Sequence, residues 1–239
     1  MKLTQDQIEE LFRFTRAHYV EYYDLQLELV DHLANGIEKQ WEEKPGLTFE
    51  EAKNLEFKKF GVFGFEDVIA QRRKAMSKRY RGIIWKYLTE WFLWPKILIT
   101  TFLIVGIALI LNQVVNEESK LITVMALSIL LVFSSFAYFF WTRKDRELNM
   151  VKGGKKLILS EMIYNFGDII HINNLLLQVG IWIMNTQDYS MHTYWFDITF
   201  ATVWVLLCLV SYIAIILIPS QAEELLAETY PEYKISQSL

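Results

Sequence analysis

Six polar or ionisable residues lie in, or just before, an apolar segment over residues 163–184. With about 100° of rotation per residue, all six fall on one half of a helix, whereas Asn173 falls on the other half. Ionisable groups are costly in lipid, so such a stripe normally faces a bundle interior or water. It could serve as a proton or ion path, a ligand pocket or an acid–base site. This candidate intramembrane polar site consists of Glu161, Asn165, Asp168, His171, Asn174 and Gln178.

A purely structural role accounts for the same six residues. They closely follow a basic loop, so Asp168 could lie near the cytoplasmic interface and pair with Lys155 or Lys156. Asn and Gln in membrane helices also hydrogen-bond to neighbouring helices without any further role. The sequence leaves both interpretations open.

Three residues near the N-terminus form a second set. Glu28 and His32 are four residues apart and share a helix face, where Asp31 and His18 could complete a set of metal ligands. No HExxH-like or His-rich pattern accompanies them, so no metal site is expected. We predict instead that His32 lies at the edge of a helical core, with Asp31 or Glu28 setting its tautomer. Glu28, Asp31 and His32 then form a candidate face for docking a partner.

The sequence does not predict an enzyme. Intramembrane aspartyl enzymes need two aspartates on facing spans, and the only span-associated aspartates are Asp168 and Asp197. We expect these two at opposite rims of the membrane, which excludes a shared acid–base site. No catalytic residue and no cofactor is therefore assigned.

A run of basic residues marks the point where the chain enters the membrane. Residues 1–71 hold 15 acidic residues against 8 basic ones, a net charge of −7, whereas residues 72–86 carry +7. Aromatic residues and an apolar run follow, as expected at a membrane surface, where basic residues also contact anionic lipid. Because the soluble part is acidic, direct binding of nucleic acid is not expected. The membrane-surface collar comprises Arg72, Arg73, Lys74, Lys78, Arg79 and Arg81.

Four apolar segments are long enough to cross a bilayer. Basic charge precedes the first segment and lies between the second and third, while the other two loops are acidic or neutral. By the positive-inside rule, both termini are cytoplasmic, and we expect a multi-pass protein of the cytoplasmic (inner) membrane. The predicted spans cover about residues 97–115, 121–141, 163–184 and 196–218.

The acidic N-terminal part is expected to be helical. Thr4 with Gln7 and Thr48 with Glu51 have the spacing of capping boxes, which begin helices. A later helix is expected to start near Glu66 and to continue through the collar into the first span. The fold class is thus all-α, a small cytosolic helical domain followed by a four-helix transmembrane bundle. The predicted parts are a cytosolic domain at 1–75, a juxtamembrane helix at 76–96, a membrane domain at 97–219 and a cytosolic tail at 220–239.

Residues 20–75 resemble a known helical domain. The pattern is Asp24-x-x-x-Glu28-Leu29-x-Asp31-His32-Leu33-x-x-x-Ile37-Glu38, then Thr48-Phe49-Glu50-Glu51-Ala52, then Phe60-Gly61-x-x-Gly64-Phe65. It is similar to the cytosolic HAAS domain at the N-terminus of bacterial multi-pass membrane proteins. Because such proteins are often encoded beside PadR-type transcription regulators, the resemblance implies a regulatory role and a PadR-type cytosolic partner. It assigns no catalytic residue.

Two functions fit these patterns. The first is a non-enzymatic regulatory, sensory or partner-tethering membrane protein with a cytosolic interaction domain. The alternative is a small transporter, or a subunit of a transport complex, that uses the polar stripe of the third span. Four spans enclose a small interior, so a homo-oligomer is compatible with either function.

Overall fold

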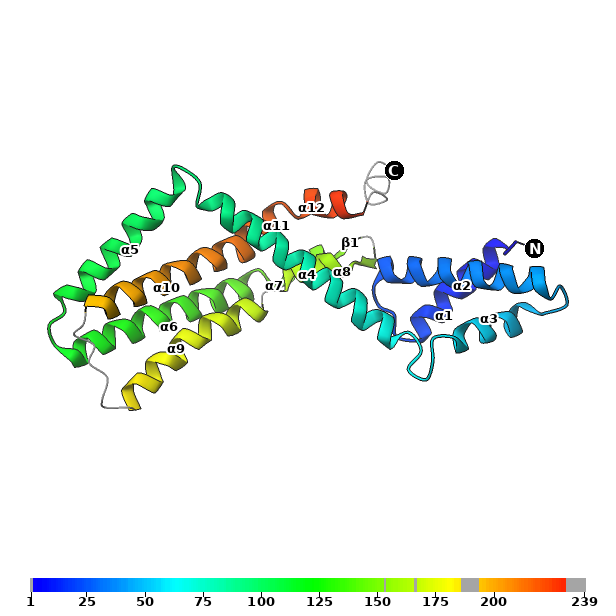
Figure 1. Cartoon of the computed structure of the whole chain (residues 1–239), viewed down its shortest axis with the longest axis horizontal. Coiled ribbons are helices and arrows are strands. Elements are labelled where there is room, and N and C mark those ends of the chain that lie inside the picture. The colour runs from blue at the N-terminus through cyan, green and yellow to red at the C-terminus, as the bar shows by residue number, and fades with distance from the viewer. Residues whose placement is uncertain (1, 153, 166, 186–193, 231–239) are drawn as a thin grey trace. The chain divides into compact units, whose positions relative to one another are not determined.

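The computed structural model describes residues 2–152, 154–165, 167–185 and 194–230 (Figure 1). Within these ranges the chain is all-α, as predicted, apart from an antiparallel pair of two-residue strands, β1 (Val151–Lys152) and β2 (Lys155–Lys156). It divides into two compact units, which are described separately below. The first unit is Met1–Arg79 with Asn149–Glu161, and the second is Tyr80–Leu148 with Met162–Leu239.

The first unit differs from the predicted cytosolic domain in one respect. The predicted cytosolic domain ends at residue 75, and residues 149–161 are part of the predicted membrane domain, before its third span. In the structure this loop segment packs with the N-terminal helices. Its position could not be predicted, because no periodicity in the loop indicates which surface it contacts.

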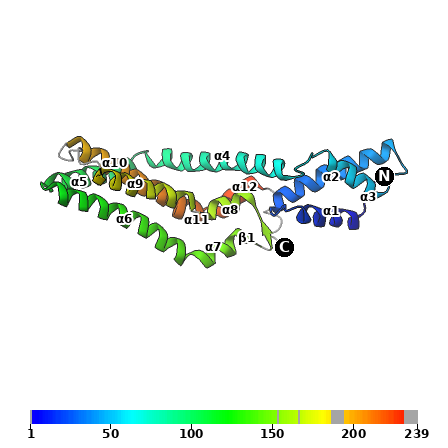
Figure 2. The same cartoon turned by 90° about the horizontal axis from the view of Figure 1, so that it is seen from below.

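Four helices form most of the first unit (Figures 1 and 2). The predicted capping boxes are confirmed, because Thr4 caps the first helix with Gln7 and Thr48 caps the third with Glu51. Gly61 and Gly64, between the third and fourth helices, have φ angles of 82° and 56°, which glycine adopts without strain. The helices are α1 (Gln5–Ala17), α2 (Tyr23–Glu43), α3 (Phe49–Lys58) and α4 (Glu66–Trp91), and α4 belongs to this unit as far as Arg79.

One apolar stripe of α2 provides the core of the first unit. Leu25, Leu29, Leu33 and Ile37 recur every four residues and are at most 2% exposed. Burying each of these side chains stabilises the fold by about 1.5–3 kcal/mol.

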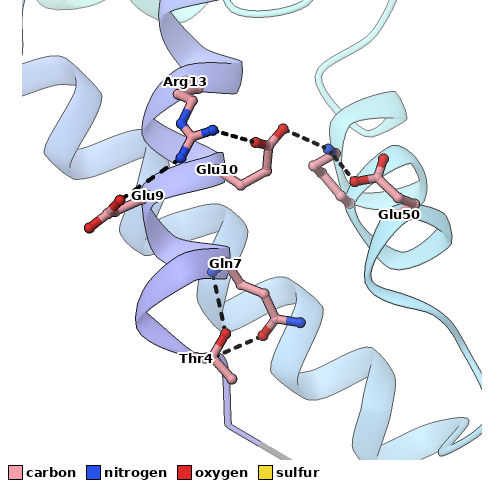
Figure 3. Close-up of polar contacts among 7 residues, drawn as sticks. Thr4, Gln7, Glu9, Glu10, Arg13 and Glu50 are labelled. Atoms are coloured by element: carbon pink, nitrogen blue, oxygen red, sulfur yellow. Dashed lines mark hydrogen bonds and ion pairs between the residues drawn. The ribbon is translucent and has the colours of Figure 1, made fainter.

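A buried lysine adds a polar contact between α1 and α3. The Lys53 ammonium lies 2.8 Å from Glu50 and 3.6 Å from Glu10, and Glu10 also pairs with Arg13 on α1 (Figure 3). Because the Lys53 side chain is only 6% exposed, these two carboxylates compensate for its lost hydration.

The predicted continuity between the collar helix and the first span is wrong. Helix α4 ends at Trp91, and α5 (Lys96–Gln113) begins after a turn that contains Pro95. Proline lacks a backbone N–H and disfavours a helical conformation in the residue before it. The turn therefore separates the collar from the first predicted span.

The second unit contains the apolar helices. Three of its helical stretches, Lys96–Gln113, Glu117–Trp141 and Tyr194–Ser220, are long and apolar enough to cross a membrane. They cover the first, second and fourth predicted spans. The helices are α5, α6 (Glu117–Trp141), α7 (Arg143–Met150), α8 (Ile158–Tyr164), α9 (Gly167–Asn185), α10 (Tyr194–Tyr212), the π-helical η1 (Ile213–Leu217), α11 (Ile218–Ser220) and α12 (Ala222–Thr229), with α7 and α8 each divided between the two units.

Helix α9 covers most of the third predicted span. It is not among the three membrane-length apolar helices found in the described part of the chain, and the side chains of its last residues lie outside that part. The third span, and with it the four-helix bundle, therefore stays a prediction. The end of the predicted tail, residues 231–239, also lies outside the described residues.

Helices α5, α6 and α10 share an apolar core (Figure 1). Leu111 near the end of α5 packs with Val124 near the start of α6 and Phe200 near the start of α10. Helix α5 thus runs opposite to the other two.

Candidate functional site

A cluster of charges in the first unit brings together residues that the sequence assigned to separate sites. Glu161, from the predicted polar stripe, lies with its Oε2 atom 2.6 Å from the Lys156 ammonium. Arg73, from the predicted collar, approaches Oε1 of the same carboxylate at 3.6 Å. The Tyr22 hydroxyl donates a hydrogen bond to it as well. We call Glu161, Lys156, Arg73 and Tyr22 the Glu161 junction.

Further contacts attach the segment Asn149–Glu161 to the start of α2. Lys156 also pairs with Glu21 at 3.2 Å, and the Lys155 ammonium lies 4.3 Å from the ring centroid of Tyr23. The backbone N–H of Ile158 donates to Asp24 at 3.4 Å. The segment is thus held at several points by polar contacts to residues 21–24.

The pKa values in the junction favour its charged state at neutral pH. Burial opposes ionisation of Glu161, but the hydrogen bonds and charges of Lys156, Tyr22 and Arg73 outweigh it and lower the pKa below the usual 4.5. Burial likewise opposes the charge on Lys156, yet Glu161 and Glu21 raise its pKa above the usual 10.5. Burial and Glu161 raise the pKa of Tyr22, which therefore keeps its proton and acts as a donor.

The predicted docking face is only partly free. Glu28 forms an ion pair with Arg72 of the collar, and both side chains remain about half exposed. Asp31 accepts a hydrogen bond from Asn35 at 3.1 Å. His32 is exposed, and its ring meets the ring of Phe60 edge-on at 5.5 Å between centroids.

His18, weighed as a further metal ligand, belongs to an aromatic cluster. Its Nδ1 atom donates to the carbonyl of Phe14 at 2.8 Å, and its ring packs on Phe57 and Phe65. Among the described residues, no group of three or more His, Cys, Asp and Glu side chains could hold a metal ion.

The collar divides into two parts. Arg72 and Arg73 contact carboxylates of their own unit, Glu28 and Glu161 respectively. The other four collar residues are exposed on α4, where they are available to other charges. They are Lys74, Lys78, Arg79 and Arg81.

The structure does not gather the six stripe residues at one site. Glu161 belongs to the junction of the first unit, whereas Asn165, His171 and Gln178 are exposed in the second unit. Asn174 is half-buried there, and the side chain of Asp168 lies outside the described part of the chain.

The buried amide of α9 is Asn173, which the helical wheel had separated from the stripe. Its side chain donates to Ser135 of α6 at 3.0 Å and to Ser211 of α10 at 2.9 Å, and the residue is 1% exposed. Sequence reasoning missed this contact, although serines in two apolar helices were a signal for interhelical hydrogen bonds.

A second buried polar contact joins the starts of α6 and α10. The Lys120 ammonium lies 2.9 and 3.1 Å from the two carboxylate oxygens of Asp197. The two side chains are 3% and 1% exposed. The sequence predicts Lys120 at the end of a loop and Asp197 at the rim opposite to Asp168, and nothing in their spacing indicates that the two pair.

Comparison with protein-family models, with curated proteins and with solved structures finds no match for this chain. The resemblance to HAAS domains over residues 20–75 therefore stays a prediction from the sequence. The function proposed below is supported by the contacts within each unit.

Proposed function

We propose that this chain is a non-enzymatic regulatory membrane protein of the cytoplasmic membrane, whose N-terminal helical domain binds a cytosolic partner. The Glu161 junction relates the state of the membrane helices to that domain. One observation carries the proposal, namely that Asn149–Glu161 packs in the same unit as the N-terminal helices. This segment lies in the chain between two of the predicted spans, so it connects them covalently to the interaction domain.

The junction joins residues near two of the three chain connections between the units. Helix α4 leads to α5, and the segment Asn149–Glu161 leads to α9. Arg73 lies on the first connection and Glu161 on the second, and the two residues form an ion pair. A displacement of one connection relative to the other separates that pair. A partly exposed pair contributes about 1 kcal/mol or less, so a modest signal suffices to break it.

The directions of the helices support four spans with both termini on one side. Lys120 contacts Asp197, and Asn173 bridges Ser135 and Ser211. The two contacts lie about 20 Å apart along both α6 and α10, so these helices are parallel. If both cross the bilayer, the chain between them must cross back. Helix α9, with 19 residues, is about 28 Å long and fits this third crossing.

The side on which the termini lie follows from charge. Helix α5 starts, and α6 and α10 finish, at the same end of the second unit. Basic residues lie at this end, including Lys96 at the start of α5 and Arg143 and Lys144 just after α6. The positive-inside rule makes this end cytoplasmic, and it puts the N-terminal domain in the cytosol.

The partner proposed for the domain is a cytosolic regulator. Residues 1–71, which form most of the first unit, carry a net charge of −7, and Glu28, Asp31 and His32 are all exposed on α2. The sequence resemblance to HAAS domains points to a PadR-type regulator. In this arrangement the protein sequesters the regulator at the membrane, and the junction sets how the domain is presented.

A pull-down tests this proposal. The full-length protein in mild detergent is compared with a variant carrying Glu28→Ala, Asp31→Ala and His32→Ala, and captured proteins are identified by mass spectrometry. A control variant changes the exposed acids Glu42 and Glu43 of α2 to alanine, which leaves the proposed face intact. We expect one cytosolic regulator to be retained by the wild type and the control but lost from the triple variant. Retention by all three forms, or capture of membrane proteins alone, contradicts the proposal.

The transporter remains the alternative from the sequence, and its test is separate. A transport path needs the stripe to face an enclosed interior, whereas His171 and Gln178 are exposed. The buried Asn173 amide is instead hydrogen-bonded to two serines of neighbouring helices. These positions support a packing role for α9. If Asp168→Asn combined with His171→Ala abolished a substrate flux while the protein stayed folded, the transporter would replace the regulatory function.

A further inference from the structure

The second unit contains an apolar cavity between α5 and α10. Its volume is about 190 Å³, and its walls include Ile99, Leu103 and Ile107 from α5. Helix α10 contributes Val205, Cys208 and Leu209. Ile99 and Leu103 are also about half exposed, so the cavity opens onto the outer surface of two membrane-length helices.

The composition of the walls selects an apolar occupant. A bound water needs two to four polar partners, and a dry apolar cavity of about 150 Å³ can already hold a benzene-sized molecule. From Thr100 to Ile107 the cavity follows α5 for about 10 Å. An elongated hydrocarbon chain fits this shape better than a compact solute.

One end of the cavity has the residues of a membrane interface. Trp91 and Tyr212 line it and meet edge-on, with 5.5 Å between ring centroids. The Trp91 indole N–H donates to Thr100 at 3.1 Å, which fixes the orientation of the ring. The exposed Lys96 ammonium lies 5.1 Å from the centroid of that ring. A cation is therefore held beside the aromatic end of an apolar slot.

We propose that this cavity binds one acyl chain of an anionic phospholipid, whose phosphate is bound by Lys96. Trp and Tyr prefer the headgroup level of a bilayer, and a basic residue there attracts anionic lipid. The aromatic pair then surrounds the ester region, and the aliphatic walls surround the chain. This site is independent of the partner-docking face, because it depends only on residues of the second unit.

Native mass spectrometry of the full-length protein tests the site. Phosphatidylglycerol and phosphatidylcholine with identical acyl chains are added to the protein in mild detergent. We expect one tightly held phosphatidylglycerol per chain. Lys96→Gln should weaken its binding about fivefold, the effect of one basic residue near a membrane surface, whereas Lys86→Gln on α4 should not.

A cavity-filling variant tests the acyl-chain part. Leu103→Trp places a larger side chain at the cavity, and Leu109→Trp is the matched control, because it changes a similarly exposed leucine of α5 outside the cavity. We expect only Leu103→Trp to lose the lipid. Equal retention of the lipid by both variants, or equal binding of the two phospholipids to the wild type, overturns the proposal. Either result would mean that the protein binds lipid only non-specifically.

Cys208 offers a measurement that needs no substitution. It is the only cysteine in the chain, and it lines the cavity. We expect phosphatidylglycerol to slow alkylation of this thiol by a small maleimide, with less protection from phosphatidylcholine. An alkylation rate that neither lipid changes contradicts occupation of the cavity.

Discussion

Two charged contacts, one in each unit, show how burial changes the cost of separating similar charged groups. In the second unit, Lys120 and Asp197 are almost completely buried and make two short contacts. In the first unit, Glu161 is 18% exposed, Lys156 29% and Arg73 54%. A buried charge that loses its partner has no water to replace it, whereas a partly exposed one does.

This difference in exposure fits the roles proposed for the two contacts. The Lys120–Asp197 contact holds two parallel helices in register and tolerates no separation. The Glu161 junction is partly exposed and can open at smaller cost, and its ion pair between Arg73 and Glu161 lies near two of the chain connections between the units. The comparison therefore predicts a graded series of effects.

The largest effect is expected from Asp197→Ala. It leaves the Lys120 ammonium buried without its carboxylate, which should destabilise the fold by about 3–5 kcal/mol. The measurement is thermal unfolding in detergent, together with the yield of monodisperse protein. Replacing both residues with Leu should recover most of the loss, because no buried charge remains. An unchanged melting temperature for Asp197→Ala would show that this pair does not hold the bundle.

A smaller loss is expected when the buried amide of α9 is removed. Asn173→Leu deletes the hydrogen bonds to Ser135 and Ser211 and should cost about 1 kcal/mol, the usual range for such contacts in membrane helices. The control is His171→Leu on the exposed face of the same helix, which should cost nothing measurable in the same unfolding assay. If the control cost more than Asn173→Leu, the assignment of the two faces of α9 would be wrong.

Glu161→Gln should open the junction with little effect on the rest of the protein. We expect a loss of about 1 kcal/mol or less, with faster amide exchange confined to residues 149–161. Hydrogen exchange of the full-length protein measures this. Lys144→Gln, a change of another exposed charge in the same stretch of chain, should leave the exchange unaltered.

The junction should also respond to pH in a defined direction. The pKa of Glu161 in the folded protein lies below 4.5, so its stabilising contribution is complete above pH 4.5 and is lost as the pH falls through the lower folded value. The pKa of Lys156 lies above 10.5, so its contribution is complete below that pH and is lost as the pH rises through the folded value. If the amides of residues 149–161 lost their protection from hydrogen exchange between pH 6 and 8, the charges of Glu161 and Lys156 would not be what stabilises the junction.

The smallest effect on stability is expected from Arg72→Gln. Its ion pair with Glu28 is about half exposed, and such pairs contribute about 0–1 kcal/mol. The change should nevertheless release Glu28 for docking and strengthen capture of the cytosolic partner in the pull-down. A large drop in melting temperature, without any change in capture, would assign the pair to stability instead.

Local features were predictable because neighbouring residues determine them. The two capping boxes, the apolar stripe of α2 and the three membrane-length helices follow from spacing and hydropathy. The turn at Pro95 was missed, although proline itself was the signal for it. The apolar and aromatic pattern is continuous on both sides of Pro95, so hydropathy by itself does not indicate a break there.

The polar contacts were less predictable, because each depends on a second residue far away in the chain. Asp197 pairs with Lys120, and Glu161 pairs with Arg73. Helical periodicity also placed Asn173 on the wrong side, since a wheel shows which residues share a face but not which face is turned inward. Hydrophobicity alone did not decide this for α9, where apolar side chains occupy both faces.

The sequence by itself determined the all-α class, the capped starts of α1 and α3 and the stretches with the length of a bilayer. These depend on backbone caps and on the transfer of apolar side chains, which act within a few residues. Only the tertiary structure decided that the loop segment 149–161 packs with the N-terminal helices and that Glu161 contacts the collar. Ion pairs act through space, so their partners become known only when the chain has folded.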